Sequence, residues 1–272
     1  MMQFSLFEQI ALAIFLLSGI SFFLYHLLLR LKIILKGKSD FSIDQLPKRI
    51  ARVFDEVILH KKVASGKRKS AGILHALVMY GFIFFGLITI NHFGMAFGLP
   101  IFSDSIRHAY FLFFGAPWAI LCSIGILGLA YRRFVIKPEA LGKFSSTSAI
   151  VSVFIVTLMV TYLIDEFHIL SGAAEKFNWW LHSGVIGGFL FLIPQSKHMH
   201  LVLSPFNIFL RPFEVPSHGA IPIDMEASEE ELDNLLLDLS RLSKDQALDI
   251  FTCVECGRCT DVCPANRGGG IL

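Results

Sequence analysis

Four cysteines near the end of the sequence carry its strongest chemical signal. Cys253, Cys256, Cys259 and Cys263 follow one another at the spacing C-x2-C-x2-C-x3-C, and Pro264 comes directly after the last of them. Thiolates at this spacing are typical ligands of [4Fe–4S] clusters, because three of them fit one loop around a cluster. Zinc is the alternative, but zinc motifs rarely place three cysteines at this spacing before Cys-Pro. The sequence therefore predicts an iron–sulfur site at these four residues.

This cysteine run resembles one half of a two-cluster module. The fourth cysteine of such a run usually binds the second cluster of a pair, so a complete module needs another run. The sequence ends nine residues after Cys263, following three consecutive glycines. We expect the rest of the module to lie outside this sequence or on a partner chain. The alternative is that Cys263 completes a single cluster with its three neighbours.

Histidines inside apolar stretches form the second candidate site, because ionisable side chains in membrane segments are rare and mark function. His182 and His200 are eighteen residues apart, which is five turns of a straight helix, so they share one face. His75 and His92 are seventeen residues apart and share only a broad face, which makes His92 the less secure of the two. Pro194 lies between His182 and His200 and could kink that helix.

Along one helix, His75 and His92 are separated by a rise of roughly 26 Å, and along the other, His182 and His200 are separated by roughly 27 Å. If the helices run in opposite directions, His92 meets His182 near the outer membrane surface. His75 then meets His200 near the inner surface. Two imidazoles from facing helices supply both axial ligands of a haem iron. We therefore predict two bis-histidine b-type haems stacked across the bilayer.

A polar cluster follows the fourth apolar stretch. His168 lies close to Asp165 and Glu166 and could replace His92 as an axial ligand. It could instead line a quinone pocket, where the cluster would exchange protons with a reduced quinone, or belong to a hydrated loop. The other histidines are expected at surfaces or interfaces: His26, His60, His108, His198 and His218.

Five apolar stretches must position these side chains. The chain has 272 residues, of which 54% are hydrophobic and 17% charged, and its mean hydropathy is +0.62. This composition excludes a disordered chain and a typical water-soluble enzyme. Each stretch is long enough to cross a bilayer core of about 30 Å as a helix. They run from about Leu6 to Leu35, Ala71 to Leu99, Ala109 to Tyr131, Ala149 to Ile169 and Trp179 to Phe209.

Basic residues predict the orientation of these stretches. Of the 24 lysines and arginines, twelve lie from Arg30 to Lys69, four follow the third stretch and six lie from Lys197 onward. Only Arg107 and Lys176 remain for the opposite side. The positive-inside rule therefore places the N-terminus on the outer side of a prokaryotic inner membrane and the C-terminus on its cytoplasmic side. The reducing cytoplasm suits thiolate ligands rather than disulfides.

A basic amphipathic helix is expected between the first two stretches, behind Pro47. Such a helix lies on anionic lipid or docks against the cytoplasmic domain, and both alternatives stay open. Its apolar residues recur at helical spacing: Leu46, Ile50, Val53, Phe54 and Val57.

Short helices are expected before the cysteines, because Ser228 with Glu231 and Ser243 with Gln246 form capping-box patterns. Cys122 is expected to be a packed small residue within the third stretch. We predict an all-α membrane protein in three parts. Residues 1–210 form a five-helix membrane domain, residues 211–250 form a cytoplasmic linker with short helices, and residues 251–272 begin a ferredoxin-like iron–sulfur domain.

Two stretches of sequence resemble a known family. These are the membrane-bound iron–sulfur oxidoreductases that join a cytochrome b domain, similar to the gamma subunit of respiratory nitrate reductase, to a heterodisulfide-reductase-like iron–sulfur domain. The fifth span of the family and its exit are similar to the segment from Trp180-Leu-His182 through Ser196-Lys-His-Met-His200 and Pro205-Phe-Asn207. Phe251-Thr-Cys253-Val-Glu-Cys256-Gly-Arg-Cys259 resembles the first cluster motif. The second cysteine run of the family and its cysteine-rich domains are missing, and the nitrate reductase subunit has a shorter histidine spacing on its second helix.

The resemblance implies an electron-transferring-flavoprotein:menaquinone oxidoreductase. Electrons from that flavoprotein, or from another cytoplasmic redox partner, would pass through the iron–sulfur segment and two b-type haems to quinone in the bilayer. The alternative is a non-catalytic haem-bearing anchor and electron conduit of a heterodisulfide-reductase-like or nitrate-reductase-like complex. A transporter with a regulatory cluster is less favoured, because no internal repeat matches the break at Pro194. No nucleic-acid partner is expected.

Overall fold

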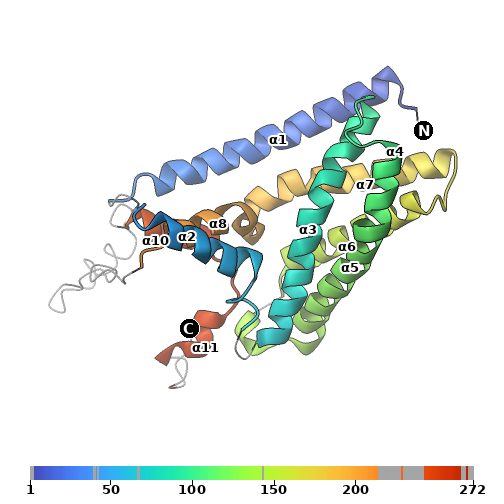
Figure 1. Cartoon of the computed structure of the whole chain (residues 1–272). Coiled ribbons are helices and arrows are strands. Elements are labelled where there is room, and N and C mark those ends of the chain that lie inside the picture. The colour runs from blue at the N-terminus through green and yellow to red at the C-terminus, as the bar shows by residue number, and fades with distance from the viewer. Residues whose placement is uncertain are drawn as a thin grey trace. The chain divides into compact units, whose positions relative to one another are not determined.

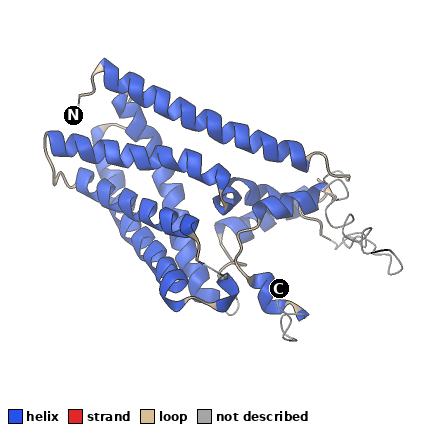
Figure 2. Ribbon diagram, turned by 180° about the vertical axis from the view of Figure 1, so that it is seen from behind, coloured by secondary structure: helices blue, strands red, loops and turns tan. Residues whose placement is uncertain are grey.

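The computed structural model describes residues 3–38, 41, 43–65, 68–142, 144–213, 228, 242–264 and 268. All regular secondary structure in this part of the chain is helical (Figure 2). The capping box predicted at Ser228 and Glu231 lies outside the described residues, because Glu231 is not among them.

In the part of the chain that the structure describes, four helices are long and apolar enough to cross a membrane. They match the first four predicted stretches, which confirms those predictions at this level. The third of these helices, Asp104–Ile136, is composite. One π-helical turn, Phe111–Gly115 (η3), lies between its two α-helical parts, and another, Arg132–Ile136 (η4), ends it. The four are α1 (Leu6–Ile34), α3 (Lys69–Ala96), the composite helix Asp104–Ile136 containing α4 (Asp104–Tyr110) and α5 (Ala116–Tyr131), and α6 (Ser146–Glu166).

The fifth predicted stretch is not one helix. α7 (Ala173–Leu192) ends two residues before Pro194, and α8 (His200–Leu210) begins only after two short 3-10 segments, η6 (Ile193–Gln195) and η7 (Lys197–Met199). Proline lacks the N–H that a helix needs and its ring clashes with the preceding turn. Ser196 then adopts an extended backbone, with φ −134° and ψ 170°. The prediction of a continuous helix from Trp179 to Phe209 is therefore wrong, and so is the five-turn spacing of His182 and His200.

The chain forms two compact units. One contains Met1–Ser21, Lys62–Phe191 and Cys256–Leu272, and the other contains Phe22–Lys61 and Leu192–Glu255. We describe each unit by itself.

In the first unit, α3, α5 and α6 pack in that order, with α5 in the middle (Figure 1). Two glycines allow α3 and α5 to approach closely. A Cβ atom at Gly125 would lie 2.7 Å from the carbonyl oxygen of Leu74, and one at Gly81 would lie 2.9 Å from the Cys122 sulfur. Cys122 is buried at this contact, so it is a packed small residue as predicted.

In the second unit, α8 packs against α10 (Lys244–Thr252). α10 begins at the predicted capping box, because the Ser243 hydroxyl accepts from the Gln246 amide and the Gln246 side chain accepts from the Ser243 amide. That prediction is confirmed. The buried core of the unit consists of Ile34, Met199, Leu203, Ala247 and Leu248.

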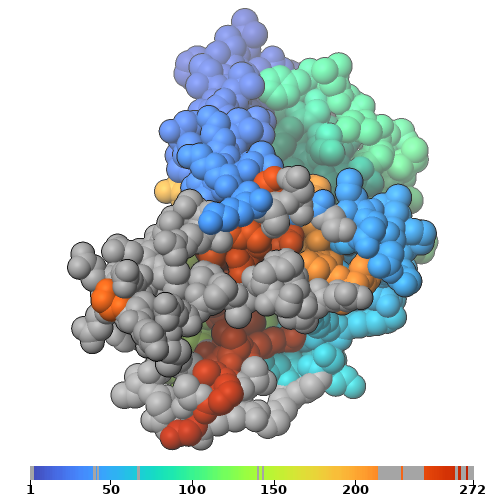
Figure 3. Space-filling model, turned by 90° about the vertical axis from the view of Figure 1, so that its left-hand side faces the viewer, coloured from blue at the N-terminus to red at the C-terminus, as the bar shows by residue number. Residues whose placement is uncertain are grey.

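The basic amphipathic segment forms α2 (Leu46–Val53), which packs beside α8 in the same unit (Figures 1 and 3). Its polar face makes this contact through Arg49, whose side chain is only 1% exposed. The apolar stripe of α2 stays on the surface, with Leu46, Ile50 and Phe54 at least half exposed. α2 therefore packs against α8 through its polar face. Contact of its exposed apolar face with anionic lipid stays a prediction.

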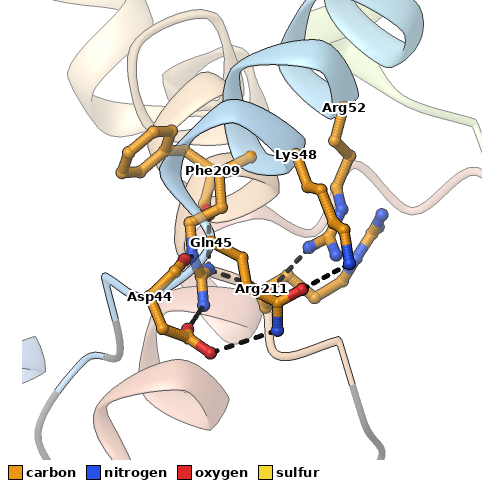
Figure 4. Close-up of polar contacts among 7 residues, drawn as sticks. Asp44, Gln45, Lys48, Arg52, Phe209 and Arg211 are labelled. Atoms are coloured by element: carbon orange, nitrogen blue, oxygen red, sulfur yellow. Dashed lines mark hydrogen bonds and ion pairs between the residues drawn. The ribbon is translucent and has the colours of Figure 1, made fainter.

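Arg49 holds the end of α8 in place. Its guanidinium donates hydrogen bonds to the carbonyl oxygens of Asp44, Phe209 and Arg211 and pairs with the Asp44 carboxylate at 2.7 Å. Figure 4 labels these three partners, together with Arg52, which also donates to the Arg211 carbonyl oxygen. Carbonyl groups at the end of a helix have no partner within the helix. Arg49 supplies that partner and so ties α2 to α8.

We expect Arg49→Ala to destabilise the second unit by about 1–3 kcal/mol for each carbonyl that stays buried without a donor. The loss is measured as a lower midpoint of chemical unfolding in detergent. Lys48→Ala is the matched control, because Lys48 is an exposed neighbour on the same helix. Equal losses in the two variants would contradict the role given to Arg49.

Candidate functional site

His92 on α3 and His182 on α7 lie against each other in the first unit. Their ring centroids are 5.0 Å apart and their planes are inclined by 58°. The predicted meeting of these two side chains is therefore present. The His92 ring also stacks on Trp179, with centroids 4.7 Å apart, and its Nε2 lies 2.9 Å from the Ser183 hydroxyl.

Thr161 on α6 determines which nitrogen of His182 carries the proton. Its hydroxyl oxygen lies 2.7 Å from His182 Nδ1 and 2.6 Å from the carbonyl oxygen of Thr157. A hydroxyl has one proton and a carbonyl oxygen only accepts, so the hydroxyl donates to Thr157 and accepts from His182 Nδ1–H. The lone pair of neutral His182 is therefore on Nε2. Histidines that bind metals are commonly oriented by such a hydrogen bond from the other ring nitrogen.

A cavity of about 250 Å³ lies beside the two imidazoles. Phe102, Tyr110 and Tyr162 provide aromatic walls, while Asp165 and His168 line its polar part. Sequence reasoning left three possibilities for His168, and the structure places it on this cavity. The ring that faces His182 is that of His92.

Arg107 and Glu166 also line the cavity and form an ion pair of 3.1 Å. The Glu166 side chain is 9% exposed. Arg107 Nε is buried without a hydrogen-bond partner in the described part of the chain. An unsatisfied buried donor costs about 1–3 kcal/mol, so an oxygen atom of a ligand at this point would be stabilising.

Two asparagines fix the elements around the cavity. Asn178 on α7 donates to the carbonyl oxygen of Thr161 on α6. Asn91 on α3 accepts from the backbone amides of Ile101 and Phe102, which orders the turn after that helix. These bonds hold the ends of α3, α6 and α7 that carry the imidazoles and Thr161.

His75 and His200 belong to different units, so their pairing stays a prediction. His75 is half-buried in the second turn of α3. His200 begins α8, and its Nδ1 lies 2.8 Å from the Lys197 carbonyl oxygen. Because that oxygen only accepts, Nδ1 carries the proton and Nε2 of the neutral ring does not.

His60 is buried, although it was expected at a surface or interface. Its Nδ1 lies 2.8 Å from the Val57 carbonyl oxygen, and its backbone is left-handed with φ +52°. It follows the π-helical turn Phe54–Ile58 (η1), an irregular element that hydrophobic spacing does not predict. The expectation for His60 is therefore wrong.

The cysteine motif lies around α11 (Arg258–Val262). All four cysteines are unpaired, with Cys253, Cys256 and Cys259 exposed and Cys263 half-buried. Among the described residues, no three His, Cys, Asp or Glu side chains are gathered closely enough to hold a metal ion. The four thiols are the donor set that the sequence predicts for an iron–sulfur site.

Two curated proteins are distant homologues of this chain over most of its length. The probable iron-sulfur-binding oxidoreductase FadF of Bacillus subtilis (strain 168) is 31% identical in an alignment of 280 positions, which covers 92% of this chain and 39% of the relative. An EtfAB:quinone oxidoreductase of Syntrophomonas wolfei subsp. wolfei is 23% identical in an alignment of 306 positions, which covers 95% of this chain and 41% of the relative. The chain thus spans about two fifths of the length of these relatives. No family model and no solved structure matches it.

Proposed function

We propose that this chain is the membrane part of a quinone-linked oxidoreductase. It passes electrons between a cytoplasmic electron-transferring flavoprotein, or another iron–sulfur or flavin donor, and menaquinone in a prokaryotic inner membrane. The proposal rests above all on His92 and His182, which lie 5.0 Å apart beside a cavity in a chain with four helices able to cross a membrane. The names of the two relatives support iron–sulfur binding and quinone chemistry. The N-terminus is assigned to the outside and the cysteines to the cytoplasm.

The imidazoles fit the axial ligands of a b-type haem. His182 presents an unprotonated Nε2, and His92 would exchange its hydrogen bond to Ser183 for the metal. To hold one haem iron between them, the two rings would have to separate from their present contact. A second haem at His75 and His200 is proposed from the resemblance to the cytochrome b domain rather than from helix spacing, and His168 is the alternative to His92.

When bound, the two haems and the [4Fe–4S] cluster or clusters held by Cys253, Cys256, Cys259 and Cys263 would supply one-electron chemistry. The protein orients their ligands and excludes water. Thr161 keeps the proton of His182 on Nδ1, and Trp179 holds the His92 ring by stacking.

The polar part of the cavity suits a quinone head group. A quinone ring is flat and its carbonyl oxygens accept hydrogen bonds, which matches the aromatic walls and the unsatisfied Arg107 Nε–H. Reducing a quinone to a quinol takes two electrons and two protons. The Asp165 carboxyl group lines the same cavity and would relay protons to the quinone, while Glu166 stays ionised in its pair with Arg107.

We expect Thr161→Val to weaken haem binding at His182 about 10–100-fold, the usual effect of losing a hydrogen bond that orients a metal ligand. Valine keeps the shape of threonine but cannot accept from His182 Nδ1–H. Haem titration of the purified protein measures the affinity. Thr161→Ser keeps the hydroxyl and should bind like wild type, and an unchanged affinity in Thr161→Val would contradict the role of the hydroxyl.

The test of the proposed function is reoxidation by quinone. The purified chain, reduced chemically in proteoliposomes under nitrogen, is mixed with a short-chain naphthoquinone while haem absorption is followed. The proposal expects reoxidation that saturates with quinone concentration. Haem that stays reduced would contradict direct quinone chemistry and indicate the conduit function instead.

A further inference from the structure

We propose that Arg68 and Arg258 staple the cysteine segment to the beginning of α3, so that this segment is docked before any cluster forms. The inference rests on the proposed function only in taking the cysteines as cluster ligands. The docking itself uses only contacts between arginine side chains and backbone carbonyl groups, so it is tested in the cluster-free chain.

The staple consists of two reciprocal contacts within the first unit. Arg258, at the start of α11, donates to the carbonyl oxygens of Lys62 and Val63 at 3.0 and 2.8 Å. Arg68, which directly precedes α3, donates to the carbonyl oxygens of Cys256 and Gly257. Each segment thus offers one guanidinium to two backbone carbonyls of the other. A guanidinium holds two acceptors in a fixed planar arrangement, which sets orientation as well as distance.

Two glycines make this arrangement possible. A Cβ atom at Gly72 of α3 would overlap the carbonyl oxygen of Val63, so the segment that receives Arg258 lies directly on the helix. Gly257 has φ +72°, a left-handed conformation that favours glycine, and it turns the chain sharply between Cys256 and α11. The cysteine segment, the chain at Val63 and α3 therefore form one continuous contact.

The staple holds the cysteines near the end of α3 that carries His75. Gly72 precedes His75 by three residues, a rise of about 4.5 Å along the helix. The two guanidinium groups also place positive charge beside the cysteine segment, which would favour an anionic cluster. The staple holds the backbone carbonyl groups of Cys256 and Gly257, so these contacts do not use the cysteine sulfur atoms.

This arrangement differs from the usual behaviour of small cysteine-rich segments, which often fold only when the metal binds. Here contacts to the beginning of α3 supply the docking of residues 256–263.

Hydrogen exchange of the cluster-free full-length chain in nanodiscs tests the staple. Amides of residues 256–263 are expected to exchange slowly in wild type and about tenfold faster in Arg68→Gln and in Arg258→Gln. Lys61→Gln is the matched control, because it removes a nearby positive charge whose ion pair with Asp55 is exposed and does not touch the cysteine segment. Arg258→Lys keeps the charge but cannot hold both carbonyls in plane, so an intermediate rate is expected.

Fast exchange in cluster-free wild type, or wild-type rates in both glutamine variants, would overturn the staple. A wild-type rate in Arg258→Lys would also contradict it, because charge alone would then suffice. Cluster and haem content of separately reconstituted samples report on the proposed function. Slow exchange without any cluster after reconstitution would refute the cluster but keep the staple. Fast exchange in a protein that does assemble a cluster would refute only the staple.

Discussion

Replacing His182 with alanine is expected to lower the haem content of the purified chain from about two per protein to about one. His182 is the better-defined ligand of its pair, because Thr161 fixes its proton on Nδ1 and leaves Nε2 to bind iron. The haem assigned to His75 and His200 does not depend on it. Haem extraction and protein quantification give the stoichiometry.

Two further variants sharpen this result. His92→Ala should cause the same loss as His182→Ala, because both rings serve one iron. His168→Ala is the matched control, since it removes an imidazole that lines the same cavity from the loop after α6. Unchanged stoichiometry in His182→Ala would contradict the pairing. A loss in His168→Ala but not in His92→Ala would assign the axial position to His168.

Cys256→Ser is expected to abolish the electron paramagnetic resonance signal of the reduced iron–sulfur cluster while leaving haem content unchanged. The thiolate is the iron ligand, and a serine hydroxyl does not ionise in its place near neutral pH. The cysteine is exposed at the turn before α11, so the substitution removes a ligand without opening a cavity.

Cys122→Ala provides the comparison for the cluster. Cys122 is the fifth cysteine of the chain and packs on Gly81 inside the first unit, away from the motif. Its replacement should leave the cluster signal intact. A cluster signal that survives Cys256→Ser, or one that disappears with Cys122→Ala, would show that the motif has been assigned wrongly.

The sequence was informative where local chemistry decides the structure. Four apolar stretches were long enough to be recognised as helices, and the Ser243 and Gln246 pattern correctly predicted the beginning of α10. The opposite directions of the histidine helices were enough to predict that His92 and His182 meet.

The break after α7 shows why the fifth stretch could not be predicted with the same success. Pro194 is compatible with either a kink or the end of a helix, and hydrophobicity continues on both sides of it. The extended backbone at Ser196 decides the outcome, and α8 then begins a different packing arrangement. Position along one helix is therefore no guide to where His200 lies.

Several side chains of the site depend on packing between distant segments. Thr161 reaches His182 only because α6 lies beside α7, and Arg107 was noticed for its charge rather than for its ion pair with Glu166. Helical spacing offered one signal, since Thr161 is one turn before Asp165 on the face that lines the cavity. The contacts of Arg68 and Arg258 join residues nearly two hundred positions apart, which no local pattern reveals.

The most direct test of the account is the dithionite-reduced minus air-oxidised absorption spectrum of the full-length chain, purified from haem-replete membranes. If imidazoles from two helices coordinate one haem iron, the spectrum must show the sharp bands of six-coordinate b-type haem. The account predicts those bands, at about half amplitude when alanine replaces His182. A flat difference spectrum from folded, membrane-extracted protein would contradict it.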